Sequence, residues 1–254
     1  MGFDSKLFRQ KSREKIVSEH FSRQAYVRPH TSVTELLSCV RQNYYARSKY
    51  DINVDKNFNF PYLKLYADVG TAIHEHLQTI YPFTEIKKAV YSENFKVKGE
   101  ADAINKNYLC EIKSTEVKKI KFLPDIEHFY QGNMYAHILN TNYGYNINGV
   151  TIIYVFRDDL KRDPLAMDFK VDSTLAIDFL SRSLILLDAL ERKVIPEKIG
   201  STEDKCKWCA YSNYCIKDGD GIKIEAMVKK EETKKEKEHK KEKKRPHEIS
   251  TFKI

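Results

Sequence analysis

The feature that most constrains the fold is a pair of short strand-like runs joined by a tight turn. The first run is FKVKGEADAI at positions 95–104, and the second is YLCEIKS at 108–114, with the polar residues NKN between them. Such a pattern predicts a β-hairpin. A helix pattern, two further strand-like runs and a long amphipathic helix follow, at 125–140, 149–157, 165–171 and 173–194. Because strands and helices alternate within one segment, the sequence predicts an α/β or α+β fold.

Two helices are expected before the hairpin. The segment TSVTELLSCVRQNYYAR at 31–47 reads as one helix, with Ser32 as its N-cap and an apolar face. A loop at 51–63 separates it from a second helix at 67–81. The second helix is expected to bury a stripe at helical spacing, formed by Val69, Ile73, Leu77 and Ile80.

The charge of the chain is unevenly distributed. The formal net charge is +8, and residues 229–245 contain ten Lys or Arg and five Glu. This stretch carries about +5, which leaves roughly +3 for the rest, so charge alone does not identify a polyanionic partner. We expect a polar segment at 1–30, one folded domain at 31–222, and a charged tail at 223–254 that is disordered because it has no apolar face to bury.

The N-terminal residues and the cysteines indicate the compartment. The first fifteen residues are polar and charged and include no apolar signal-peptide core, and no apolar run reaches the length of a membrane span. We therefore expect a cytoplasmic protein of a bacterial, archaeal or phage-infected cell. In that reducing compartment, clustered cysteines bind metal more often than they form disulfides.

A carboxylate and an ammonium group occur together in the second strand of the hairpin. Glu111 and Lys113 are two residues apart, so both side chains point to the same face of the strand. Asp102 in the first strand would lie directly opposite Glu111 if the turn consists of Lys106 and Asn107 alone. Two adjacent carboxylates repel each other, and a divalent cation relieves that repulsion. The alternative is an Asp and a Glu on the solvated face of an edge hairpin.

Two helical positions add weaker signals. His74 lies on a different helix face from the expected apolar stripe, and Gln131 and Tyr135 are four residues apart on one face of another helix. Taken singly, a lone histidine is more often structural, and such a Gln–Tyr pair is more often ordinary surface.

Together these motifs resemble the PD-(D/E)XK nuclease superfamily, specifically the RecB-like exonucleases. The matching motifs are Gly70-x-x-x-His74, Gly99-x-x-Asp102, Glu111-x-Lys113 and Gln131-x-x-x-Tyr135, in that order. The resemblance covers roughly residues 30–218 and implies a restriction-endonuclease-like core, with a mixed central sheet flanked by helices. It further implies that His74, Asp102, Glu111 and the backbone carbonyl of Ile112 bind Mg²⁺ or Mn²⁺. By the same resemblance, Lys113 assists the attacking water, and Gln131 and Tyr135 support the site and the DNA.

The remaining motif is a cysteine cluster. Cys206-x-x-Cys209 is followed by Cys215, and a fourth ligand would have to come from Cys39 or Cys110. Cys110 is expected to point into the core, which favours Cys39. The arrangement resembles that of AddB and the CRISPR-associated Cas-four exonucleases, which implies a structural [4Fe–4S] cluster held by Cys39, Cys206, Cys209 and Cys215. A zinc site and unligated thiols are the alternatives, because spacing alone does not distinguish iron–sulfur from zinc.

The resemblance implies a metal-dependent DNA exonuclease that acts on DNA ends or single strands. Recombination, repair, phage DNA processing and CRISPR adaptation all suit such an enzyme. The chain has no G-x-x-x-x-G-K-[ST] phosphate loop, which argues against a fused helicase. Two alternatives remain: a DNA-binding or adaptor protein that kept the fold without catalysis, and a zinc-stapled nucleic-acid-binding module.

Overall fold

A computed structural model describes residues 28–48 and 60–220. The described chain forms two compact units, the first reaching Gly200 and the second beginning at Ser201. Residues 1–27 of the predicted polar segment at 1–30, and the whole predicted tail at 223–254, lie outside the described residues. Within the part of the chain that the structure describes, no helix combines the length and the apolar composition that crossing a bilayer requires.

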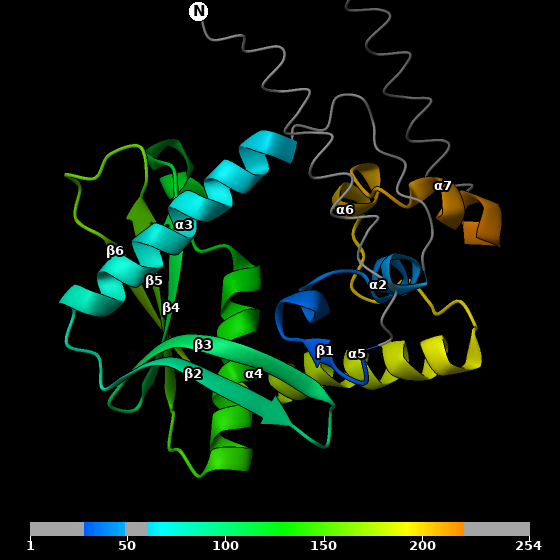
Figure 1. The fold of residues 1–254 in the computed structure, drawn as a ribbon, viewed down its shortest axis with the longest axis horizontal. Coiled ribbons are helices and arrows are strands. Elements are labelled where there is room, and N and C mark those ends of the chain that lie inside the picture. Colours follow the sequence, from blue (N-terminus) through cyan, green and yellow to red (C-terminus); the bar gives the residue numbers. More distant parts are fainter. Residues whose placement is uncertain (1–27, 49–59, 221–254) are drawn as a thin grey trace, which may run out of the picture. The chain divides into compact units, whose positions relative to one another are not determined.

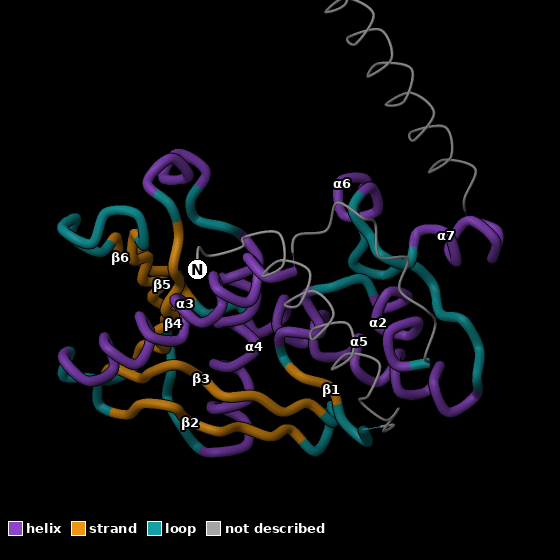
Figure 2. Tube along the Cα trace, turned by 45° about the horizontal axis from the view of Figure 1, so that its top comes forward, coloured by secondary structure: helices purple, strands orange, loops and turns teal. Residues whose placement is uncertain are grey.

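The first unit is built on a mixed six-stranded sheet (Figures 1 and 2). Its strands are β1 (Thr31–Ser32), β2 (Glu85–Ser92), β3 (Val97–Asn105), β4 (Tyr108–Thr115), β5 (Gly149–Phe156) and β6 (Leu165–Lys170). The order is β1-β3-β4-β5-β6, and β2 pairs with β3 outside this path. The β4–β5 pair is parallel, whereas β2–β3, β3–β4 and β5–β6 are antiparallel. The expected mixed α/β architecture is therefore confirmed.

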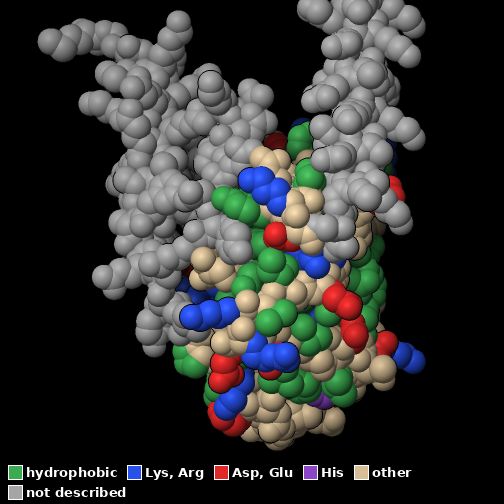
Figure 3. Space-filling view, turned by 90° about the vertical axis from the view of Figure 1, so that its right-hand side faces the viewer, with side chains coloured by type: hydrophobic (Ala, Val, Ile, Leu, Met, Phe, Trp, Pro, Cys, Tyr) green, Lys and Arg blue, Asp and Glu red, His purple; other side chains and the backbone are tan. Residues whose placement is uncertain are grey.

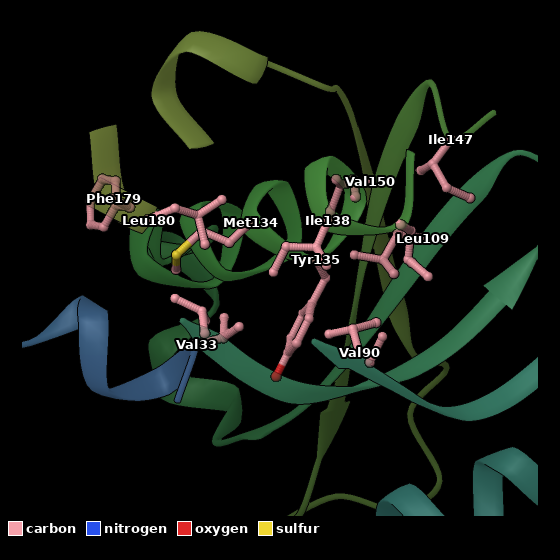
Figure 4. Packing of buried hydrophobic residues seen from close by; sticks show 14 of the residues in the cluster. Val33, Val90, Leu109, Met134, Tyr135, Ile138, Ile147, Val150, Phe179 and Leu180 are labelled. Carbon is pink, nitrogen blue, oxygen red and sulfur yellow. The ribbon is translucent and has the colours of Figure 1, made fainter. Parts of the chain in front are cut away.

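Helices α4 (Ile126–Tyr143) and α5 (Ser173–Arg192) supply much of the core. Asp125 caps α4 by accepting a hydrogen bond from the Glu127 amide at 3.0 Å, and Gly144 ends it at a φ of 71°. Gly132 allows α4 to approach β5, because a Cβ there would lie 2.4 Å from Val150 Cγ1. Figure 4 shows the resulting packing, in which side chains of both helices lie with those of β2, β4 and β5: Val90, Leu109, Met134, Ile138, Val150 and Leu180.

The helix expected at 31–47 is interrupted. Residues 31–32 form β1, a 3₁₀ turn η1 spans Thr34–Leu37, and the α-helix α2 begins only at Val40 and ends at Arg47. Ser32 and Glu35 exchange hydrogen bonds at this turn: the Ser32 hydroxyl accepts from the Glu35 amide and the Glu35 carboxylate accepts from the Ser32 amide, both at 3.2 Å. Val33 is at the N-cap of η1, however, so the predicted cap lies one residue too early. Cys39 has extended backbone angles and precedes α2 instead of lying within a helix.

The long helix before the hairpin also differs from the prediction. Helix α3 runs over Phe60–Ile80, so it begins inside the segment predicted as a loop. Its expected apolar stripe is not buried, since Ile80 is 61% and Val69 is 37% exposed. The polar Gln78 is buried instead. Figure 1 shows α3 crossing the strands diagonally.

Two smaller differences concern elements with weak sequence patterns. The sequence analysis did not predict β2, whose sequence EIKKAVYS is half charged or polar. In α5, which was expected to be amphipathic, Leu184 is 43% exposed, whereas Phe179, Leu180 and Leu186 are buried.

The second unit consists of short helical turns. Within the described residues these are α6 (Glu203–Lys207), α7 (Ser212–Cys215) and a π-helical turn, η3 (Ile216–Asp220). Thr202 caps α6 by accepting a hydrogen bond from the Lys205 amide at 3.2 Å. Three of the five cysteines lie in this unit.

Candidate active site

The candidate site forms where β3 and β4 separate. The turn between them is Lys106–Asn107, which is the condition under which Asp102 was expected to lie opposite Glu111. The ladder runs from Asn105–Tyr108 to Ala103–Cys110. One residue further along, Asp102 and Glu111 follow the same register, but the strands no longer pair. The Ile112 amide donates instead to Asp102 Oδ2 at 2.8 Å. The Asp102 side chain thus takes the place of a backbone hydrogen bond between the two strands, and this contact fixes its carboxylate. We call the opening between β3 and β4 at Asp102 and Glu111 the strand fork.

On each side of the strand fork, the strand remains paired with a different neighbour. Strand β3 stays paired with β2 as far as Val97, whereas β4 stays paired with β5 as far as Thr115. In Figure 2 the β2–β3 pair runs at a steep angle to β4, β5 and β6. Asp102 and Glu111 therefore lie at the point from which the two halves of the sheet diverge.

Glu111 is deeply buried and held by a cation. Its relative exposure is 1%, and Lys113 Nζ lies 2.6 Å from Glu111 Oε1. Lys113 Nζ also donates to Gln131 Oε1 at 3.0 Å, which brings α4 into the site. Strand periodicity places the Glu and the Lys on one face, and the helix orients the ammonium group between the carboxylate and the amide.

The second oxygen of Glu111 has no such partner. Glu111 Oε2 is buried without a hydrogen bond. Burial raises the pKa of this carboxyl to about 7, with Asp102 adding to the rise and Lys113 and His74 opposing it. A buried carboxylate oxygen without a donor carries a desolvation penalty that a bound cation would relieve.

Helix α3 contributes two side chains one turn apart. His74 Nδ1 lies 3.3 Å from Asp102 Oδ1, and Gln78 Nε2 donates to the Asp102 backbone carbonyl at 2.7 Å. Both contacts position Asp102. The sequence analysis missed Gln78, although its place four residues after His74 on the same helix face is a signal that could have identified it.

Tyr135 closes the site from α4. It is 3% exposed, and Figure 4 shows its ring reaching from the helix toward the strands. Burial raises the pKa of its hydroxyl, and the charge of Glu111 raises it further. A Cβ at Gly99 would lie 2.7 Å from the Tyr135 ring and 2.8 Å from its hydroxyl oxygen. Gly99 therefore provides the space that Tyr135 occupies.

Substitution by alanine is expected to have different effects at the two motif glycines, Gly99 and Gly70. Gly99→Ala should lower turnover in the activity that the sequence motifs predict by about tenfold or more, because its methyl group would displace a buried ring beside Gln131 and Glu111. Gly70→Ala is the matched control, since its Cβ would meet only Ser114 Oγ at 3.4 Å. That helical substitution should raise stability by up to about 1 kcal/mol. Turnover and thermal unfolding measured on both variants check this, and equal turnover would contradict the packing role of Gly99.

The site suits a divalent cation by donor chemistry. Two carboxylates, one imidazole and the Ile112 backbone converge on the strand fork, and oxygen-rich sets of this kind bind Mg²⁺ and Mn²⁺. Over residues 28–48 and 60–220, however, no three His, Cys, Asp or Glu side chains are grouped closely enough to hold a metal ion. The donor types and the unpartnered Glu111 oxygen thus fit a cation, but the donor atoms are not close enough together to coordinate one.

The cysteines fall in both units and form no disulfide. Cys39 and Cys215 are buried, whereas Cys206 and Cys209 are half-buried. The Cys209 amide donates to the Cys206 carbonyl at 3.3 Å, so these two lie on one tight turn. Cys110 is 3% exposed on the strand face opposite Glu111, as expected, and burial raises the pKa of its thiol to about 11. The predicted cluster joins Cys39 of the first unit to three cysteines of the second, and it stays a prediction.

Comparisons with known proteins show similarity in fold. No protein-family model matches the chain, and no curated protein matches it significantly. A solved structure described as SSO0001 has 21% sequence identity and a TM-score of 0.52, covering 83% of this chain and 95% of its own. An alkaline exonuclease from Laribacter hongkongensis, LHK-Exo, has 15% identity and a TM-score of 0.46, covering 69% of this chain and 93% of its own. The first similarity concerns the fold, and the mixed sheet flanked by helices fits a restriction-endonuclease-like core. The second is too weak to bear on activity.

Proposed function

We propose that this chain is a divalent-metal-dependent deoxyribonuclease that removes nucleotides from DNA ends or single strands. The observation that carries the proposal is the Glu111–Lys113 pair at the strand fork, beside Asp102. Glu111 is buried and Lys113 is half-buried, and the pair is linked to α4 through Gln131. A purely structural role does not account for a buried carboxylate whose second oxygen lacks a donor.

The roles of the residues follow from their contacts. Asp102 and Glu111 would hold the cation, together with His74 and the Ile112 carbonyl. When bound, Mg²⁺ or Mn²⁺ would polarise a phosphoryl oxygen and acidify a water molecule. Lys113 would offset the negative charge that develops on the phosphate and orient the attacking water. Gln131 holds the Lys113 ammonium in place, and Tyr135 fills the space above Gly99.

The placement of the Glu111–Lys113 pair also supports this proposal over the two alternatives. A protein that only binds DNA gains nothing from placing Glu111 and Lys113 against each other in the core, because such a pair carries a desolvation penalty. A zinc-stapled module would not need the strand fork at all. The proposal therefore places catalysis in the first unit and leaves the cysteines a structural role.

Incubation of end-labelled DNA with the purified protein tests this function. Single- and double-stranded substrates labelled at either end are incubated with Mg²⁺, with Mn²⁺ or with EDTA. We expect cleavage that requires the metal and starts from an end. Binding without cleavage under every metal condition would favour the non-catalytic adaptor, and internal cuts in circular DNA would contradict the exonuclease assignment.

We also propose that Cys39, Cys206, Cys209 and Cys215 hold a [4Fe–4S] cluster with a structural role. The tight turn at Cys206–Cys209 suits two thiolates that bind one centre. Bridging Cys39 to the second unit would remove much conformational entropy from the unfolded chain, because the loop it closes is long.

Two cysteine variants are expected to differ sharply. Cys39→Ala should lose the brown colour and the bound iron and should lower the unfolding temperature by several degrees. Cys110→Ala should keep both, because Cys110 is buried within the sheet of the first unit. Iron and zinc analysis of both proteins provides the measurement. One equivalent of zinc without iron in the unmodified protein would overturn the cluster, and loss of iron in the Cys110 variant would show that Cys110 is the fourth ligand.

A further inference from the structure

We propose that a basic cleft after β4 binds the sugar–phosphate backbone of a single DNA strand, with one unpaired base stacked on Phe122. This inference rests on the proposed nuclease function, because it names the path by which the substrate reaches the strand fork. Its test nevertheless requires no cleavage.

The cleft continues directly from the candidate active site. It has a volume of about 920 Å³ and lies between the carboxyl end of β4, the 3₁₀ turn η2 (Val117–Phe122) and the start of α4. Ser114 and Thr115 line it, immediately after Lys113, and His128 lines it one turn before Gln131. The cleft therefore adjoins the candidate active site along β4 and α4, and Thr115 lies about 7 Å along the strand from Lys113.

Positive charge is concentrated along the cleft. Four cationic side chains line it, and the only acid among the lining residues is Asp125. Asp125 Oδ1 already accepts from the Glu127 amide at the start of α4. The cations are Lys118, Lys119, Lys121 and Arg157.

Two of these cations are held in place by one carboxylate. Glu116 lies 2.7 Å from Arg157 Nη2 and 2.7 Å from Lys118 Nζ, and these cations hold the pKa of Glu116 at about 2. Lys119 and Lys121 extend from the exposed side of η2. Flexible, exposed lysines suit phosphate binding, because they can follow a backbone that moves through the cleft.

Phe122 provides a surface that phosphate binding alone would not need. It lines the cleft, is 70% exposed, and has Lys121 Nζ 5.0 Å from its ring centroid. Exposed aromatic rings beside cations bind single strands by stacking on unpaired bases, whereas the bases of a duplex are already stacked. This combination favours a single strand over duplex DNA as the occupant.

The positive charge in the cleft does not depend on histidine. Burial lowers the pKa of His128 to about 4, and the charge of Lys113 lowers it further. His128 Nδ1 lies 3.0 Å from the Tyr154 hydroxyl, which orients the ring at the wall of the cleft. On the face seen in Figure 3, by contrast, described Lys and Arg side chains lie among Asp and Glu. The residues that line the cleft are therefore more uniformly basic than that face.

Fluorescence anisotropy in EDTA tests the proposal without hydrolysis. The probe is a labelled oligothymidylate, titrated at several salt concentrations. In the Lys119→Gln/Lys121→Gln variant we expect weaker binding at low salt and a slope of log K against log salt that is shallower by about 1.4, since each phosphate contact to a single strand contributes about 0.7. The matched control is Lys106→Gln/Lys170→Gln, which removes equal charge at the opposite end of the sheet and should keep the slope of the unmodified protein.

A Phe122→Ala variant tests the stacking contact separately. It should weaken single-strand binding by about tenfold, leave the salt slope unchanged and reduce the preference for single-stranded over duplex DNA. Equal slopes in the two lysine variants would overturn the cleft as the binding path, and unchanged binding in Phe122→Ala would overturn the stacking contact. Competition by polyglutamate as effective as that by oligothymidylate would show that the cleft takes an acidic polypeptide instead. If the protein binds as predicted but never cuts DNA, the nuclease proposal fails while this one stands.

Discussion

Glu111→Gln is expected to abolish DNA cleavage without lowering the stability of the protein. The substitution removes the charge that would hold the cation, and losing one well-placed electrostatic group reduces turnover by about 100- to 1,000-fold. The shape of the side chain is kept, and the new amide can still accept a hydrogen bond from Lys113 Nζ. The Lys113 ammonium is 18% exposed and keeps Gln131 Oε1 as a second acceptor, so it is not left buried and unpaired as the Glu111 carboxylate would be without Lys113. Because Glu111 Oε2 is buried without a donor, a neutral side chain should be tolerated at least as well as the carboxylate.

Turnover at saturating DNA and thermal unfolding in EDTA at pH 8 provide the two readouts. The matched control is Glu85→Gln, since Glu85-x-Lys87 repeats the same pattern on β2 but lies away from the strand fork. We expect full turnover in the control, and loss of turnover with an equal or higher unfolding temperature in Glu111→Gln. Full activity of Glu111→Gln would remove Glu111 from the catalytic site.

Lys113→Met is expected to destabilise the metal-free protein by about 3 kcal/mol at pH 8, because breaking a buried ion pair leaves an uncompensated charge. The remaining carboxylate would also face Asp102, so the pKa of Glu111 should rise further. A carboxyl whose folded-state pKa is raised favours folding at low pH and loses that contribution as pH rises through the folded pKa. The destabilisation should therefore be small near pH 4.5 and largest above neutrality.

A double-mutant cycle tests whether the destabilisation by Lys113→Met comes from the unpaired Glu111 carboxylate. Adding Glu111→Gln to Lys113→Met should restore most of the lost stability, because no buried charge is then left unpaired. Urea unfolding of all four proteins in EDTA, at low and high pH, provides the measurement. Lys118→Met is the surface control, since the Lys118 side chain is 77% exposed and exposed pairs contribute at most about 1 kcal/mol. Additive effects of the two substitutions would show that Lys113 stabilises the fold independently of Glu111.

The local geometry of the hairpin could be predicted from the sequence. Alternation along the strand places Glu111 and Lys113 on one face, and a two-residue turn at Lys106–Asn107 places Asp102 opposite. The turn is present, and Asp102 follows this register at the strand fork. These features depend on neighbouring residues, which is why a pattern of period two was sufficient.

The role of α3 could not be predicted in this way. Its apolar positions indicate a stripe around Val69 and Ile80, yet its buried polar residue is Gln78. The reason is the strand fork, where the Asp102 carbonyl needs a donor because β3 has separated from β4. The need for a hydrogen-bond donor to the Asp102 carbonyl arises in the sheet, so the sequence of the helix alone does not predict that Gln78 is buried.

The break before α2 has a similar long-range origin. Positions 31–47 have a continuous helical pattern, but Cys39 is extended. The Val40 amide donates to the Ile199 carbonyl at 2.9 Å, and Arg41 Nε donates to the Pro196 carbonyl at 2.6 Å. These partners lie more than 150 residues away in the sequence, and they satisfy the start of α2 without a preceding helical turn.

The most direct test of the account is a titration of the purified protein with Mn²⁺, followed by electron paramagnetic resonance of the free ion. The central claim is that the strand fork holds the catalytic cation, and a stoichiometric binding site cannot arise from a trace of contaminating nuclease. We predict that the unmodified protein and Glu85→Gln bind Mn²⁺ with similar affinity. Glu111→Gln and Asp102→Asn should each bind it at least about tenfold more weakly. Identical Mn²⁺ binding in all four proteins would contradict the account.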